Sequence, residues 1–223
     1  MLTATMQQDS SFVTSWNTEN AGSATKTVVV PTSAAGTYSC TVDWGDGTVS
    51  YMTTFNDAAW THVYASTGTY TVKIYGKFTG FVFNNGGDKL KLLAVTKWGP
   101  NFRLGTTQGA YFFGCTNLVI TVKDTLILNG TTSFVSLFRT CAAVTTVPNM
   151  NSWNTGAVTS MQNMCTGASL FNQNIGSWNT QSVLTMANMF QQAFAFNQNI
   201  GSWNTQSVTN MNSMFQQAIA FNQ

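Results

Sequence analysis

The stretch FNQNIGSWNTQSV occupies residues 171–183 and returns, letter for letter, at residues 196–208. It combines one tryptophan with a run of amides and contains no charged residue. Comparison of the chain with itself extends the same interval of 25 residues to columns of identical side chains, namely Trp153, Trp178 and Trp203, Met164, Met189 and Met214, and Ala168, Ala193 and Ala218. Self-similarity at such a period predicts an array of stacked repeats.

Two looser copies precede these repeats, FFGCTNLVITV at residues 112–122 and LFRTCAAVTTV at residues 137–147, so we expect about five repeats, the last incomplete. Within one repeat, the apolar residues of VTNMNSMFQQA (208–218) have helical spacing, and FNQNI (196–200) alternates like a short strand. The sequence therefore predicts a leucine-rich-repeat-like α/β solenoid of ~25-residue repeats, in which stacking buries the apolar side of each repeat.

The repeats are uncharged. Arg139 is the last charged residue, and residues 140–223 contain no Asp, Glu, Lys, Arg or His. Stacking explains this composition, because like charges on identical neighbours repel, whereas Asn and Gln amides form hydrogen-bonded ladders. The whole chain has only 7% charged residues and a net charge of +2, with no basic cluster beyond Lys89, Lys91 and Lys97. We therefore do not expect nucleic acid as a partner.

The N-terminal part has a different pattern. Residues 8–77 contain short alternating segments such as TYSCTVDWGDG (37–47) and TYTVKIYG (69–76), separated by turns. This pattern predicts an antiparallel β-sandwich. We expect residues 78–105 to join it to the repeats of residues 106–223 and to cap the first repeat, so the overall fold class is mixed.

Two sets of repeated residues are candidate binding residues. The first is the tryptophan column, whose rings would stack against sugars if they were exposed, or would close over the core if they were buried. The second is the amides of the predicted strands, which would either line an exposed binding face or serve only as ladders. These amides are Asn172, Gln173, Asn174, Asn197, Gln198 and Asn199.

No catalytic or cofactor site is predicted. Asp43 and Asp46 flank the turn in DWGDG and could hold a Ca²⁺ together with Asp57 or backbone carbonyls. A structural turn whose aspartates cap their own backbone is the favoured interpretation. His62 is the only histidine, and no nucleophile motif or carboxylate pair accompanies it. We expect a protein without enzymatic activity, resident metal or cofactor.

The cysteines and the N-terminal residues give information about the cellular location of the protein. Cys40, Cys115, Cys141 and Cys165 lack metal-binding spacing, which favours buried free thiols and leaves open a bridge between adjacent repeats. Residues 1–16 have no signal-peptide pattern, and no apolar run is long enough to span a membrane, so we expect no membrane insertion.

The repeat FNQNIGSWNTQSVTNMNSMFQQA resembles the BspA-like bacterial surface-protein repeat. The segments YSCTVDWGDGTVSYM and THVYASTGTYTVKIYG are similar to a PKD domain, which implies an immunoglobulin-like β-sandwich for residues 8–77. This resemblance implies a non-enzymatic, extracellular or cell-surface protein that uses its repeat face for adhesion to a protein or glycan on a cell surface. The missing export signal keeps open an alternative, a bacteriophage virion component such as a fibre, spike or decoration protein. Self-association or further repeats are expected at the C-terminal end.

Overall fold

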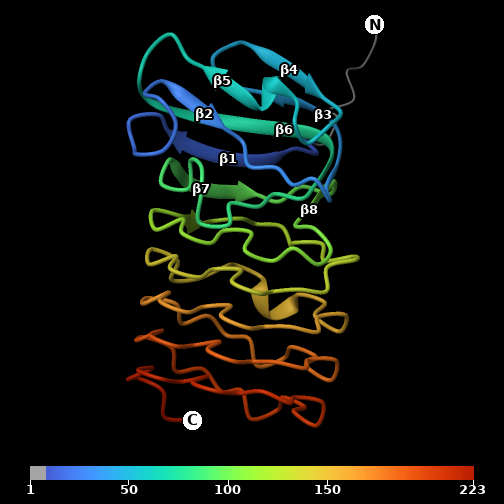
Figure 1. Cartoon of the computed structure of the whole chain (residues 1–223), viewed down its shortest axis with the longest axis vertical. Coiled ribbons are helices and arrows are strands. Elements are labelled where there is room, and N and C mark those ends of the chain that lie inside the picture. Colours follow the sequence, from blue (N-terminus) through green and yellow to red (C-terminus); the bar gives the residue numbers. More distant parts are fainter. Residues whose placement is uncertain (1–8) are drawn as a thin grey trace, which may run out of the picture.

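The computed structural model describes residues 9–223, which form a column with the long strands at one end and the repeats stacked as layers beneath them (Figure 1). The described part is all-β apart from two short 3₁₀-helices, η1 (Ala58–Trp60) and η2 (Met150–Ser152). Its strands are β1 (Phe12–Asn17), β2 (Thr27–Val29), β3 (Thr37–Asp43), β4 (Val49–Met52), β5 (Thr61–Val63), β6 (Thr69–Thr79), β7 (Leu92–Lys97), β8 (Phe102–Arg103) and β9 (Val119–Ile120). Within this part, no helix is long and apolar enough to cross a membrane.

One large mixed sheet organises the N-terminal half. Its strand order is β4-β3-β6-β1-β7-β9, with β8 paired to β6, and β2 and β5 form a separate two-stranded sheet. The β6–β8 and β7–β9 pairs are parallel, whereas the other pairs are antiparallel. The predicted immunoglobulin-like sandwich is therefore wrong. An immunoglobulin-like sandwich is antiparallel throughout, whereas this sheet adds parallel strands from the segments that lead into the repeats.

Strand β6 is the longest of the described strands, and it pairs with different strands along its first part and at its end. Its first part pairs with β1, which continues to β7 and β9, and its last residues pair with β8. Gly76 lies between these parts with a φ of 91°. A Cβ at this position would lie 2.5 Å from the carbonyl oxygen of Ser39, so the close approach of β3 requires glycine here.

The repeats contain no helix, and the predicted leucine-rich-repeat-like α/β solenoid is wrong. Each segment expected to be helical is a chain of tight turns whose backbone N–H groups alternate between two kinds of acceptor. In residues 163–168, every second N–H donates to the carbonyl three residues earlier, as Met164 does to Met161. The intervening N–H groups donate to the next layer, as Asn163 does to Ala187.

The backbone conformation shows why a helix cannot form in these segments. Asn163 and Gly167 have φ angles of 56° and 70°, and the equivalent positions of later repeats are also left-handed. Left-handed residues interrupt a right-handed α-helix. An α-helix would also use its N–H groups internally, whereas here half of them join one layer to the next. The expected strand at residues 196–200 is likewise irregular chain.

The core runs without interruption from the large sheet through the layers. Equivalent aromatic rings stack on one another, with centroids of Phe171 and Phe196 6.2 Å apart and those of Trp153 and Trp178 6.2 Å apart. The four cysteines are buried and form no disulfide bond. Burial raises the pKa of the Cys40 thiol to about 11 and the pKa of Cys115, Cys141 and Cys165 above the ordinary value.

Candidate functional site

A shallow trough of about 700 Å³ crosses three consecutive layers of the repeats. We call it the Asn–Gly–Ser trough, because its lining consists of Asn151, Asn174, Gly176, Ser177, Asn199, Gly201 and Ser202. These residues occupy a few equivalent positions of successive repeats, so the same polar groups recur from layer to layer. Two of the amides expected at a binding face, Asn174 and Asn199, are brought together here and both are exposed.

Hydrogen bonds fix the side chains of the trough. Oδ1 of Asn174 accepts the N–H of Gly176 at 3.0 Å, and Oδ1 of Asn199 accepts the N–H of Gly201 at 2.9 Å. Each asparagine thus closes a small turn with its own chain. Its Nδ2 group makes no hydrogen bond within residues 9–223 and remains a free donor at the surface.

The serine hydroxyls of the trough cross-link the layers. Oγ of Ser177 donates to the carbonyl of Asn151 at 2.5 Å, and Oγ of Ser202 donates to the carbonyl of Gly176 at 2.6 Å. A hydroxyl that has donated its proton keeps lone pairs with which it can accept a hydrogen bond. The trough therefore presents amide donors beside hydroxyl acceptors.

The floor of the trough depends on glycine. A Cβ on Gly176 would lie 2.6 Å from the carbonyl oxygen of Asn199 in the next layer. Real Cβ atoms do not approach an oxygen so closely, and the layers would have to separate. The glycine therefore brings two layers together and keeps side chains out of the trough.

The other predicted amides serve mainly as ladders. Oδ1 of Asn172 accepts both the N–H of Asn197, at 3.0 Å, and Nε2 of Gln198, at 2.9 Å. Oε1 of Gln173 accepts the N–H of Val147 at 3.0 Å. These side chains hold adjacent layers together.

The tryptophan column is not an exposed platform. Trp153 and Trp178 are 3% exposed and Trp203 is 8% exposed, and all three belong to the core. The indole N–H of Trp178 donates to the carbonyl of Met150 at 2.8 Å, and that of Trp203 donates to Ile175 at 3.1 Å. The candidate role of these rings in sugar stacking is therefore wrong, because their faces are covered by protein.

The aspartates of the DWGDG turn stabilise the turn itself. Oδ1 of Asp43 accepts the N–H of Gly45 at 2.9 Å, and Oδ1 of Asp46 accepts the hydroxyl of Thr48 at 2.6 Å. Oδ2 of Asp46 lies 2.7 Å from Nε2 of His62. Burial raises the pKa of Asp46, but the hydrogen bonds from Thr48 and His62 outweigh it and lower the pKa to about 2.

Oδ1 of Asp43 and both carboxylate oxygens of Asp46 have protein partners in this turn. No group of three or more His, Cys, Asp or Glu side chains placed to hold a metal occurs among the residues that the structure describes. The ring of His62 also stacks on Trp44 with centroids 4.8 Å apart. His62 and Asp46 thus form a bridge between β5 and the turn before β4.

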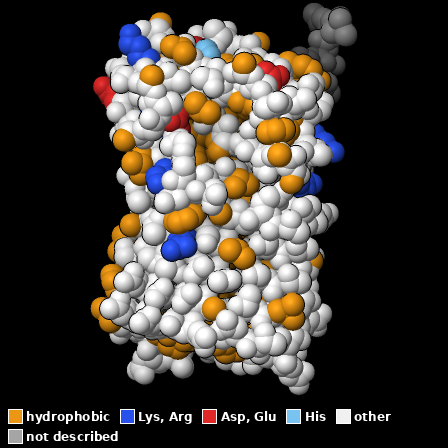
Figure 2. All heavy atoms as spheres, in the orientation of Figure 1, with side chains coloured by type: hydrophobic (Ala, Val, Ile, Leu, Met, Phe, Trp, Pro, Cys, Tyr) orange, Lys and Arg blue, Asp and Glu red, His pale blue; other side chains and the backbone are white. Residues whose placement is uncertain are grey.

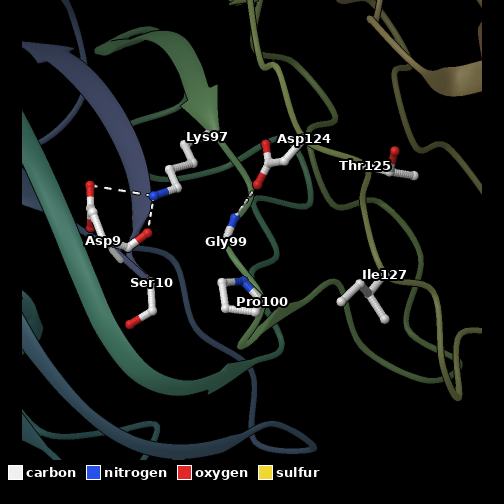
Figure 3. Close-up of a pocket in the computed structure, with 8 residues that line it drawn as sticks. All are labelled: Asp9, Ser10, Lys97, Gly99, Pro100, Asp124, Thr125 and Ile127. Carbon is white, nitrogen blue, oxygen red and sulfur yellow. Dashed lines mark hydrogen bonds and ion pairs between the residues drawn. The ribbon is translucent and has the colours of Figure 1, made fainter. Parts of the chain in front are cut away.

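A second pocket, of about 340 Å³, lies where the large sheet meets the first repeats (Figure 3). Its charged groups already have partners. Lys97 pairs with Asp9 at 3.4 Å, and the carboxylate of Asp124 accepts the N–H groups of Trp98 and Gly99 at 3.0 and 2.7 Å. These contacts join the sheet to the repeats, and we assign this pocket a structural role.

Five residues of the trough were not predicted as site residues from the sequence, namely Asn151, Gly176, Ser177, Gly201 and Ser202. The signal that points to them is the recurrence of small polar residues just before each tryptophan, in NSW at residues 151–153 and GSW at residues 176–178 and 201–203. Small residues in a repeated, exposed position indicate a concave surface, which a pattern of amides alone does not.

Comparison with known proteins gives one family match. Residues 132–223, less than half of the chain, match a family described as "Mycoplasma protein of unknown function, DUF285". No curated protein and no solved structure matched the chain. The expected identification with BspA-like leucine-rich repeats and a PKD-like domain is therefore wrong, since the matching family is a different one and the described residues contain no α-helix.

Proposed function

We propose that this protein is a non-enzymatic, surface-exposed recognition protein that binds a neutral glycan chain through the Asn–Gly–Ser trough. The observation that carries the proposal is the repetition of unpaired amide donors and hydroxyl acceptors along a concave, uncharged surface. Sugar hydroxyls both donate and accept hydrogen bonds, so they complement such a surface. The repeats present it at intervals of about 4.8 Å, the usual spacing of paired strands, which suits a polymeric ligand.

Charge favours a neutral ligand over an ionic one. Residues 140–223 contain no charged side chain, and in Figure 2 the lowest layers show neither acidic nor basic groups on the face in view. A charged polymer would gain no ion pair in the trough. A protein partner is less favoured, because strong protein interfaces usually centre on exposed aromatic or arginine side chains, and the tryptophans of the repeats are buried.

The test compares two asparagines that lie five residues apart. Asn199 lines the trough, whereas Asn204 does not, and both are exposed with Oδ1 accepting the N–H two residues later, at 2.9 and 3.0 Å. Aspartate in either place keeps this acceptor and replaces the Nδ2 donor by a negative oxygen. Binding is measured by a neutral glycan array followed by isothermal titration calorimetry of the full chain.

We expect Asn199→Asp to weaken glycan binding about tenfold or more, since a lost hydrogen bond and a desolvated charge together exceed 1.4 kcal/mol. Asn204→Asp should bind like the unmodified protein. Equal affinities for both variants, or no binding of any neutral glycan, would overturn the proposal. Circular dichroism of both variants confirms that the layers remain folded.

A further inference from the structure

The outer face of the large sheet carries a second group of polar and aromatic side chains, far from the trough in sequence. Thr41 on β3 pairs in register with Tyr51 on β4 and with Tyr75 on β6, so these three side chains share one face. The neighbouring residues Cys40 and Ile74 point to the opposite face and are buried in the core. Tyr51 is 63% exposed.

Two lysines flank Tyr75 on the same strand. Lys73 and Lys77 lie two residues before and after it, and alternate residues of a strand share a face. We call this surface the tyrosine–lysine face, consisting of Thr41, Tyr51, Lys73, Tyr75 and Lys77. With strands about 4.8 Å apart and a rise of about 3.3 Å per residue, the tyrosines lie about 10 Å apart and each lysine about 7 Å from Tyr75.

The lysines of this face are free to meet a ligand. Neither Lys73 nor Lys77 has an ion-pair partner within residues 9–223. The one acidic neighbour in register is Asp43, opposite Lys73, and its Oδ1 accepts the N–H of Gly45. Lys77 lies opposite the uncharged Ser39, so the face keeps positive charge at that end.

We propose that the tyrosine–lysine face binds a linear acidic polysaccharide, one that carries carboxylate or sulfate groups. The tyrosine rings offer apolar faces and hydroxyl tips to successive sugar rings. The lysine ammonium groups pair with the acidic substituents in charge-assisted hydrogen bonds. The exposed face of a sheet suits an extended chain, and the spacing of the tyrosines allows contacts with more than one sugar.

Charge and topology favour this ligand over nucleic acid. A nucleic acid carries a phosphate at every nucleotide and is normally bound by a dense basic patch, whereas this face has two unpaired cations. The same sheet also continues from this face toward the repeats. Ser15 on β1 pairs with Thr71 and with Ala94, and Ala94 pairs in turn with Val119 on β9. A long polysaccharide has room to extend along it.

The experiment measures binding of the full chain to heparin, polygalacturonate, dextran and oligothymidylate by surface plasmon resonance. Lys77→Gln and Tyr51→Ala test the face, and Lys123→Gln is the matched control, an exposed lysine outside it. We expect binding to at least one of the two acidic polysaccharides, weakened about tenfold by each variant of the face and by added salt. Lys123→Gln should bind like the unmodified protein, and dextran binding should not change in any of the three variants.

Three results would overturn the proposal. Equal losses in Lys77→Gln and Lys123→Gln would show unspecific attraction by net charge. Tyr51-dependent binding of oligothymidylate as tight as that of the polysaccharides would make nucleic acid the ligand, and no binding of either acidic polysaccharide would exclude the assigned class. The proposal does not rest on the trough, because Asn199→Asp should leave acidic polysaccharide binding unchanged.

Discussion

Replacement of Lys91 by methionine should lower the free energy of unfolding by about 3–5 kcal/mol, the usual cost of breaking a buried ion pair. Lys91 and Asp88 are 0% and 1% exposed, with Nζ and Oδ1 3.9 Å apart. Nζ also donates to the carbonyls of Ser23, Ala24 and Thr27 at 3.0, 2.9 and 2.7 Å. These bonds tie the loop before β2 and the first residue of β2 to the segment before β7.

The magnitude follows from the groups that the substitution would leave behind. Three carbonyls would lose a donor at about 1–3 kcal/mol each, and Asp88 would lose an attraction of about 4 kcal/mol at an effective dielectric constant near 20. Relief from burying the ammonium group offsets much of this sum. Burial lowers the pKa of Lys91 despite the nearby Asp88, which shows that this desolvation is substantial.

Urea unfolding followed by tryptophan fluorescence measures the effect, with Lys89→Met as the control. Within residues 9–223, Nζ of Lys89 bonds only to Asn85, at the surface, so its loss should cost less than about 1 kcal/mol. The double variant Asp88→Asn with Lys91→Met should lose less than the sum of the single variants, because the two groups are coupled. A Lys91→Met protein within about 1 kcal/mol of the unmodified one would refute the reasoning.

Two further predictions concern the layers and the DWGDG turn. Met189→Asp should destabilise the protein by more than about 3 kcal/mol in thermal unfolding, since Met189 is 0% exposed and a carboxyl there has no partner. Gln181→Asp is the control and should change little, because Gln181 is exposed. Similar melting temperatures of the two variants would contradict the packing. The pKa of Asp46 is about 2, below the ordinary value near 3.9, so its stabilising contacts with Thr48 and His62 are complete above about pH 4 and are lost as the pH falls through 2. The stability difference between the unmodified protein and Asp46→Asn should therefore narrow between pH 4 and pH 2, and a constant difference would show that Asp46 does not carry it.

The repeat length and the buried columns were predictable from sequence, because identical side chains at a fixed interval pack best on their own copies. Met189 and Phe190 lie in the core as their spacing predicts. The amide ladders also follow from the absence of charge, and Gln192 donates to Gln217 in the next layer at 2.9 Å.

The secondary structure of the repeats was not predictable from apolar spacing. Met161, Met164, Cys165 and Ala168 are buried at intervals of three, one and three residues, which fits a helix equally well. A chain of tight turns produces the same spacing, because each turn also returns the side chain to the same side after three or four residues. Asn163, Thr166 and Gly167, which stand between the apolar residues of this segment, were the signal against a helix, since Asn, Thr and Gly are poor helix formers that favour turns.

The candidate sites could not be predicted from the sequence for a different reason, because they depend on which strands and layers become neighbours. Tyr51 and Tyr75 lie 24 positions apart in the chain and become neighbours of Thr41 only through the strand order β4-β3-β6. In FNQNI, Asn172 and Asn174 are the same residue type in the same short segment. Oδ1 of Asn172 accepts a hydrogen bond from the next layer, whereas Oδ1 of Asn174 closes a turn in its own layer. Only the second lines the trough. What distinguishes a ladder from a binding group is thus the direction of one carbonyl oxygen, which depends on the neighbouring layer and not on the residue type.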